Sequence, residues 1–301
     1  MWKRIGYKPP RNVLLAFFAD EEASGTYGSR WLVKNRPELF AGYSEAVSEV
    51  GGFSVTINGG HRLYLVEAAQ KGIAWIKLSA KGTAGHGSFI NRDNAVTKVS
   101  DAVSRIGNYQ WPQLLTKTTT QFFKKIAELT GDKFDPKNVQ PLLNYLGNAV
   151  KMLGATISNT ANPTMLEAGY KANVIPQNAS AVIDGRFLPG YENDLHETIK
   201  KLAGDEIEVE VLTRDIALEA EFAGPLVEAM CKAINVEDSA GIPVPYLMSG
   251  GTDNKALHDL GIVGYGFSPL RLPEDLDFFA LFHGVDERVP IDGLKFGVRV
   301  L

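Results

Sequence analysis

The spacing of hydrophobic residues divides the chain into short strands and helices. Residues 13–19 (VLLAFFA) are uninterruptedly apolar and end in polar turn formers, which is typical of a strand buried on both faces. Residues 72–80 alternate between apolar and polar positions, which predicts a half-buried strand. Residues 93–106 carry apolar side chains at helical spacing behind a capping Asp93 or Asn94, which predicts an amphipathic helix.

The middle of the chain has the predicted order strand, helix, strand, strand, helix, strand, which is that of a ferredoxin-like module. We expect its strands at 72–80, 152–158, 180–187 and 207–212, and its helices at 93–106 and 195–202. Residues 111–150 interrupt the module with an insertion that we expect to be helical.

The flanking segments have α/β character. The pattern predicts strands at 13–19, 45–48 and 262–267, a hairpin around 53–66, and helices at 28–34, 225–234 and 254–260. A chain of 301 residues is long for a single core. We therefore expect an α/β domain made of residues 1–70 and 215–301, with an α+β domain, residues 71–214, inserted into it.

Composition narrows the class of protein. Apolar residues make up 45% and charged residues 22%, which is ordinary for a globular protein. The net charge of -4, without a cluster of Lys and Arg, argues against a nucleic-acid partner. The one cysteine, Cys231, allows no internal disulfide and favours a reducing, cytoplasmic location. No apolar run approaches the roughly 20 residues that cross a membrane.

Candidate chemistry begins directly after the first apolar run. Glu21 and Glu22 follow it, where open α/β sheets place their functional groups. Glu49 stands before two glycines, and His283 lies between apolar residues and a glycine. Each of these residues alone also suits a solvated turn or a packed surface position. Glu22, Glu49 and His283 together are an oxygen and nitrogen ligand set suited to zinc, so we expect them to converge in the fold.

Five stretches, in this order, resemble the M20 family of metallopeptidases, which includes carboxypeptidases, aminoacylases and dipeptidases. The resemblance runs from about Asn12 to the last residue. The matching stretches are residues 18–25 (FADEEASG), 48–49 (SE), 83–88 (TAGHGS), 250–253 (GGTD) and 283–287 (HGVDE). The resemblance implies a zinc-peptidase-like catalytic domain, and it makes the inserted module a lid and dimerisation domain.

The same resemblance assigns roles to the acids. It makes Glu21 the general base and Glu22, Glu49 and His283 ligands of a two-zinc centre. Family members also carry a His-x-Asp motif and a bridging aspartate upstream of the Glu pair. Here residues 1–19 contain neither histidine nor aspartate. We therefore expect this chain to lack an N-terminal segment of the family, and to be inactive or nearly so by itself, even with Zn²⁺ supplied.

Several further residues have candidate substrate roles. His86 lies between glycines after a predicted strand and suits polarisation of a carbonyl, although it also suits a turn histidine bonded to the backbone. Arg186 suits a substrate carboxylate or an ion pair with Asp184. By resemblance, Asn173 contacts substrate. The loop with Gly250, Gly251 and Thr252 precedes a predicted helix and forms a candidate binding site for a substrate carboxylate. The alternative is a simple capped loop.

The sequence thus predicts zinc-dependent hydrolysis of an amide bond in a small peptide or an N-acyl amino acid, by a possible homodimer without nucleic-acid or membrane partners. Two alternatives stay open. One is an inactive truncated homologue that acts at most as a dimerising or binding module. The other is a hydrolase or esterase that uses a single metal.

Overall fold

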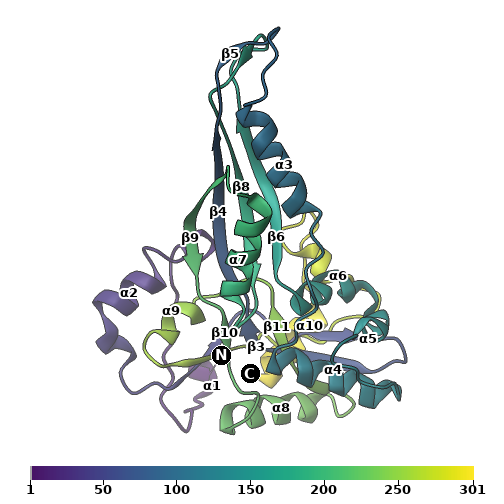
Figure 1. Ribbon diagram of the computed structural model, residues 1–301. Coiled ribbons are helices and arrows are strands. Elements are labelled where there is room, and N and C mark those ends of the chain that lie inside the picture. The colour runs from purple at the N-terminus through teal and green to yellow at the C-terminus, as the bar shows by residue number, and fades with distance from the viewer. Residues whose placement is uncertain (1) are drawn as a thin grey trace.

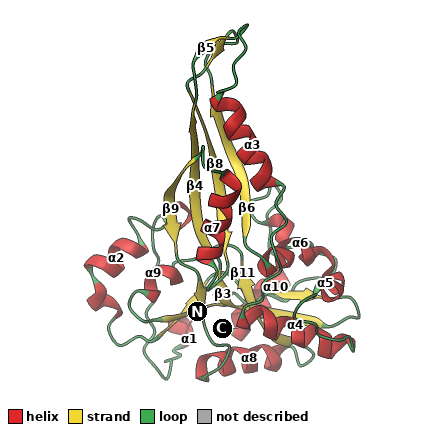
Figure 2. Cartoon of the chain, viewed as in Figure 1, coloured by secondary structure: helices red, strands yellow, loops and turns green. Residues whose placement is uncertain are grey.

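The computed structural model describes residues 2–301 and shows a broad body from which a narrow projection extends (Figure 1). The body contains a six-stranded sheet, and the projection contains a separate four-stranded sheet (Figure 2). No helix among the described residues is long and apolar enough to span a membrane.

The body sheet is organised around one buried strand, β3 (Arg62–Gln70). Its path runs β1-β12-β3-β10, and β2 and β11 also pair with β3. The remaining strands are β1 (Glu45–Ser48), β2 (Ser54–Thr56), β10 (Leu218–Glu219), β11 (Ile242–Met248) and β12 (Val263–Gly266). The hairpin and the strands predicted at 45–48 and 262–267 are therefore present.

Helices cover both faces of this sheet. One face packs on α8 (Pro225–Glu237) and α10 (Ile291–Val300), with Tyr64 stacked on Phe296 at 5.6 Å between ring centroids. The edge strand β1 shares a small core with α2 (Ser29–Asn35), η2 (Pro37–Phe40) and α9 (Asn254–His258). Two further short helices, α1 (Trp2–Ile5) and η1 (Glu21–Ala23), precede α2 in the chain. A short turn, η5 (Phe279–Leu281), packs the ring of Phe279 on Phe53.

The projection has the predicted ferredoxin-like order. Its sheet runs β6-β8-β4-β9, and α3 and α7 pack on one face. In chain order the elements are β4 (Gly72–Lys81), α3 (Ala95–Gly107), β6 (Thr160–Ala168), β8 (Asn178–Phe187), α7 (Glu192–Ala203) and β9 (Glu208–Asp215). Asn94 caps α3 through a bond from the Val96 amide to its side chain, 2.9 Å long. A small ladder, β5 (Gly85–His86) with β7 (Val174–Ile175), forms the tip.

The helical insertion packs on the body and not on the projection. It consists of α4 (Lys117–Thr130), α5 (Gln140–Leu143), η3 (Asn144–Ala149), α6 (Val150–Leu153) and η4 (Gly154–Ile157). Phe122, Phe123 and Ile126 of α4 join one core with Leu65 and Tyr246 of the body sheet. The domain boundaries at residues 71 and 215 stay a prediction. The insertion lies between these boundaries in the sequence, but it packs in the core of the body.

Two predicted strands are wrong. Residues 152–158 form the helical turns α6 and η4, because a short apolar run fits a buried helical turn as well as a strand. Residues 13–19 form no strand, and Leu15 and Phe17 are 72% and 92% exposed. The segment lies near β1, where Arg11 pairs with Glu45 at 3.4 Å, but no neighbouring strand within residues 2–301 pairs with it.

The assignment of the insertion to the body predicts separate effects of two core truncations. Phe123→Ala should cost about 3–5 kcal/mol and speed amide hydrogen exchange in β11, because Phe123 is fully buried against the body sheet. Ile183→Ala, in β8, should instead speed exchange in the projection. Hydrogen exchange with mass spectrometry measures the exchange rates in both parts of the molecule. Faster exchange in β8 but not in β11 for Phe123→Ala would contradict this packing.

Candidate functional site

The turn that carries Glu21 and Glu22 is held in place by the side chains of Asp20 and Arg30 on either side of it. Asp20 has a φ of +68°, and its Oδ2 accepts a 2.9 Å bond from the Tyr27 amide. Arg30 Nε donates a 2.8 Å bond to the Ser24 carbonyl. These contacts close the segment before α2 and hold the two glutamates on one short turn.

Carboxylates from three segments gather around Glu21. Burial raises the pKa of Glu21 to about 7, and the nearby charges of Glu49, Asp253 and Glu22 act in the same direction. Burial also raises the pKa of Asp253. The structure therefore places Glu22, Glu49 and Asp253 near Glu21, while the roles of these acids stay predictions. A carboxyl group with a pKa near 7 both accepts and releases a proton at neutral pH, which suits a general base.

A second acid, Glu67, lies behind this group in β3. It is 1% exposed, and burial raises its pKa to about 8, with Glu49 contributing in the same direction. Its Oε2 accepts a 3.2 Å bond from Gln70 Nε2. Gln70 Nε2 also donates to Thr252 Oγ1 at 2.8 Å, while the Thr252 amide donates to Gln70 Oε1 at 3.1 Å.

The loop with Gly250, Gly251 and Thr252 is thereby fixed beside the acids. Asn254 adds a second attachment, because its Nδ2 donates a 3.0 Å bond to the Oγ of Ser48, the residue before Glu49. Thr252 is 6% exposed. The predicted substrate loop and Glu49 are thus held by the same polar network.

The donors do not fit a complete metal centre. Among residues 2–301, no three His, Cys, Asp or Glu side chains form a group that could hold a metal ion. His283 is exposed on the loop after η5, with a φ of +57°, and it is not among the groups whose charge acts on Glu21. The ligand set Glu22, Glu49 and His283 is therefore not assembled here and stays a prediction.

His86 and Asn173 meet at the tip of the projection. The Gly87 amide donates a 2.9 Å bond to the Asn173 carbonyl, and His86 pairs with Val174 in the β5–β7 ladder. His86 Nδ1 lies 2.8 Å from Ser88 Oγ, and both His86 and Asn173 are exposed. The tip lies at the opposite end of the molecule from α2 and α9, which adjoin the acids (Figure 1). The structure does not bring these two residues to Glu21 of the same chain.

Comparison with known proteins now identifies the projection together with its insertion. Residues 68–209 match the peptidase dimerisation domain of the M20 family. The chain carries an M20 dimerisation domain. Among similar curated proteins, the chain is 27% identical over 316 residues to a probable carboxypeptidase S-like 2 of Dictyostelium discoideum. It is 25% identical to the human N-fatty-acyl-amino acid synthase/hydrolase PM20D1 and 24% identical to human aminoacylase-1.

These alignments cover 94–98% of this chain but 58–61% of the relatives, so the chain spans about three fifths of their length. The fold is that of M20 peptidases. An M20 metallo-carboxypeptidase of Sulfolobus solfataricus matches with a TM-score of 0.63 at 16% identity, over 93% of this chain and 67% of that one. The di-peptidase Dug1p of Saccharomyces cerevisiae matches with a TM-score of 0.63 at 14% identity, over 99% and 66%.

Arg186 lies at the base of the M20 dimerisation domain and already has a partner. Its Nε and Nη2 donate to the two carboxylate oxygens of Asp184, at 2.6 and 3.0 Å. This is the ion pair that the sequence left open as an alternative. A substrate carboxylate at Arg186 would have to share or displace Asp184.

Sequence reasoning missed the roles of Glu67, Gln70 and Asp253. The available signal for Glu67 was a lone acid inside the apolar run LYLVEAA of β3. A charged residue in a buried strand needs a partner or a raised pKa. Asp253 belongs to one of the matching stretches, but its approach to Glu21 depends on the fold.

The buried carboxyl of Glu67 predicts an unusual dependence of stability on pH. With a pKa of about 8 in the folded state and 4.5 as the reference value, the folded protein holds a proton that the unfolded chain releases between these values. Stability should therefore fall as pH rises through this window, by at most about 1.4 kcal/mol per unit. Glu67→Gln, measured by chemical denaturation, should be more stable than the wild type at pH 8.

This advantage should shrink as the pH approaches 4.5. Glu274→Gln, at an exposed acid, is the matched control and should follow the wild type. Parallel curves for Glu67→Gln and the wild type would show that Glu67 is ionised throughout.

Proposed function

We propose that this chain provides the catalytic base and substrate-binding residues of an M20-type hydrolase that cleaves an amide bond in a small peptide or an N-acyl amino acid. The observation that carries the proposal is Glu21, a half-buried acid with a pKa near 7 among Glu22, Glu49 and Asp253. The names of the similar proteins, carboxypeptidase, aminoacylase and N-fatty-acyl-amino acid hydrolase, support this substrate class.

In this mechanism Glu21 takes a proton from the attacking water and returns it to the leaving amine. The loop with Gly250, Gly251 and Thr252 holds the substrate carboxylate through the backbone amides of its two glycines, and Arg186 adds a cationic contact. His86 stabilises the oxyanion. Because His86 lies at the far tip of the projection, we propose that it acts in the site of a second copy of the chain.

We also propose that the metal of this site is zinc. The similar protein of Sulfolobus solfataricus is a metallo-carboxypeptidase, and carboxylate and imidazole groups are ligands that zinc accepts. Glu22, Glu49 and His283 stay the proposed ligands. Since these donors do not form a metal-binding group among the described residues, a complete centre requires His283 to move toward the acids and further donors to join it.

A second candidate function is that of a dimerising or binding module without activity of its own. Two observations favour it: residues 68–209 match the M20 dimerisation domain, and the described part of the chain assembles no metal group. The cytoplasmic location favoured by the single cysteine applies to both candidates.

Turnover by the purified 301-residue chain separates the two candidates. With Zn²⁺ and a panel of N-acetyl amino acids and dipeptides, the hydrolase predicts a slow zinc-dependent rate, close to background because the metal donors are not gathered within residues 2–301. The module predicts no such rate. Any zinc-dependent rate should fall about 10²–10⁴-fold in Glu21→Gln, because that variant has no carboxylate to take the proton from water.

Glu38→Gln, at an exposed acid outside the acid group, serves as the control. Robust turnover that Glu21→Gln abolishes would reject the inactive module. Turnover that survives Glu21→Gln would reject the proposed base, and complete inactivity with bound substrate would support the module.

We also propose a homodimer through the free edge of the projection. Within residues 2–301, β6 pairs with β8 alone, and its Met165 and Leu166 are 52% and 56% exposed. Edge strands with exposed apolar side chains are ready to pair with another chain. Leu166→Lys should shift the protein from dimer to monomer in sedimentation velocity. Val211→Lys, on β9 at the opposite edge and 46% exposed, should not. A monomeric wild type would refute this dimer.

A further inference from the structure

The chain passes between the body and the projection at several points, and buried lysines join three of them. Lys71 is the single residue between β3 and β4, Ser158 and Asn159 separate η4 from β6, and Ile216 and Ala217 separate β9 from β10. We call these residues, with Asp215, the neck. Each passage is a place where the two sheets would otherwise turn relative to one another.

Lys71 attaches the first passage to the second. Its side chain is fully buried, and its Nζ donates to the carbonyls of Ala155 and Ser158 at 2.9 and 2.8 Å. Lys255 of α9 attaches the first passage to the third, because its Nζ donates to the Lys71 carbonyl at 2.8 Å and lies 3.5 Å from Asp215 Oδ2.

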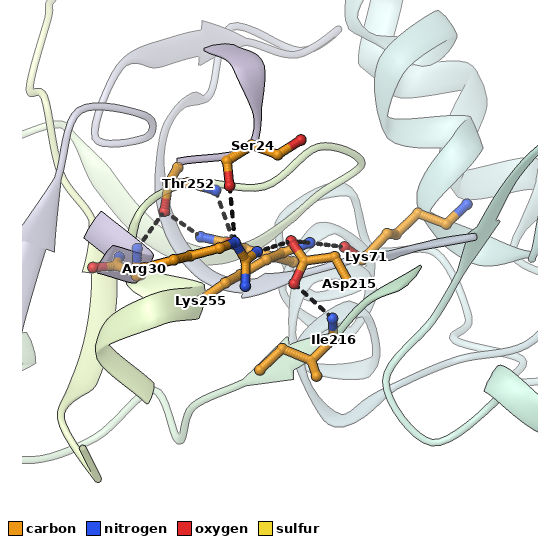
Figure 3. A network of polar contacts seen from close by, with 9 residues as sticks. Ser24, Arg30, Lys71, Asp215, Ile216, Thr252 and Lys255 are labelled. Atoms are coloured by element: carbon orange, nitrogen blue, oxygen red, sulfur yellow. Dashed lines mark hydrogen bonds and ion pairs between the residues drawn. The ribbon is translucent and has the colours of Figure 1, made fainter. Parts of the chain in front are cut away.

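Asp215 is the point where the attachments converge. Its Oδ2 also lies 2.8 Å from Arg30 Nη2, and its Oδ1 accepts a 2.8 Å bond from the Ile216 amide (Figure 3). Lys255 is 2% exposed, so its ammonium group has almost no water around it. Removing a partner from a buried charge is strongly destabilising, because the remaining charge is left uncompensated.

Both cations come from segments of the candidate site. Arg30 closes the turn of Glu21 and Glu22 through its bond to the Ser24 carbonyl. The Lys255 stem packs on Gly251, where an added Cβ would lie 2.7 Å from Lys255 Cε. The acid turn, the glycine loop and the projection therefore meet at one carboxylate.

We infer that Arg30, Asp215 and Lys255 form a latch that fixes the orientation of the dimerisation domain relative to the body, together with the positions of the acid turn and the glycine loop. Asp215 is a positioning residue of this latch and touches no substrate. The latch operates whether or not the chain hydrolyses a substrate, so its test needs no activity.

Distance measurement between the two parts tests the latch. In a Cys231→Ser background, cysteines replace the exposed Asp101 on α3 and Glu228 on α8, and both carry spin labels for pulsed electron paramagnetic resonance. We expect one narrow distance distribution. Asp215→Asn should broaden or shift it, and should speed amide exchange at residues 71–74 and 250–255 about tenfold, which corresponds to roughly 1.4 kcal/mol of local stability.

The matched control is Glu192→Gln. It removes the ion pair with Arg214, the residue next to Asp215, but that pair lies wholly within the projection. The distribution should stay narrow. Lys255→Met should resemble Asp215→Asn, and the double variant should add little, because residues of one network are not additive.

If Asp215→Asn does not fold, Arg30→Gln carries the same test, since the Arg30 side chain is 39% exposed and tolerates loss of its charge. A folded Asp215→Asn or Arg30→Gln with an unchanged distribution and unchanged exchange would overturn the latch. Equal broadening in Glu192→Gln would also overturn it, because any ion pair near the neck would then have the same effect.

Discussion

One continuous run, from β3 into β4, forms the central strand of both sheets. β3 pairs with four other strands of the body, and β4 lies between β8 and β9 in the projection. Only Lys71 separates them, and Gly72 has no room for a side chain, because an added Cβ would lie 2.1 Å from the Phe187 ring. The burial of this run ties the two sheets together, since neither sheet keeps its core without it.

The candidate site is built where this run leaves the body. Glu67 and Gln70 lie toward the end of β3, and they meet Glu49 and Thr252 from other segments. Burial raises the pKa of Glu21 and of Glu67, and the nearby charge of Glu49 acts in the same direction. The site therefore holds protons at neutral pH, and cations are placed at its border, on Arg30 and Lys255, rather than among the acids.

The body shows apolar surface in addition to this charge cluster. Residues 13–17 and Val47 of the edge strand β1 are exposed to solvent. Apolar side chains on a free sheet edge are typical of a surface that contacts another polypeptide. The projection has its own core around α3 and α7, whereas the β1 side of the body carries these exposed apolar side chains.

The sequence determined the elements whose signals are local. The alternation in β4 and the Asn94 cap of α3 follow from neighbouring residues. The ferredoxin-like order was also predicted, although its second strand is β6 and not residues 152–158. The approach of Glu21, Glu22 and Glu49 was also expected, through the family resemblance of their motifs. Local pattern failed for residues 13–19, because an apolar run becomes a strand only when a partner strand pairs with it.

Only the tertiary structure decided which core received the helical insertion, since its apolar faces suit either sheet. It also decided that Arg186 is bound by Asp184, that His86 lies far from the acids, and that Asp215 joins Arg30 to Lys255. Most of these are relations between residues distant in sequence. Their geometry depends on how the two sheets are oriented about the neck, and no spacing along the chain encodes that orientation.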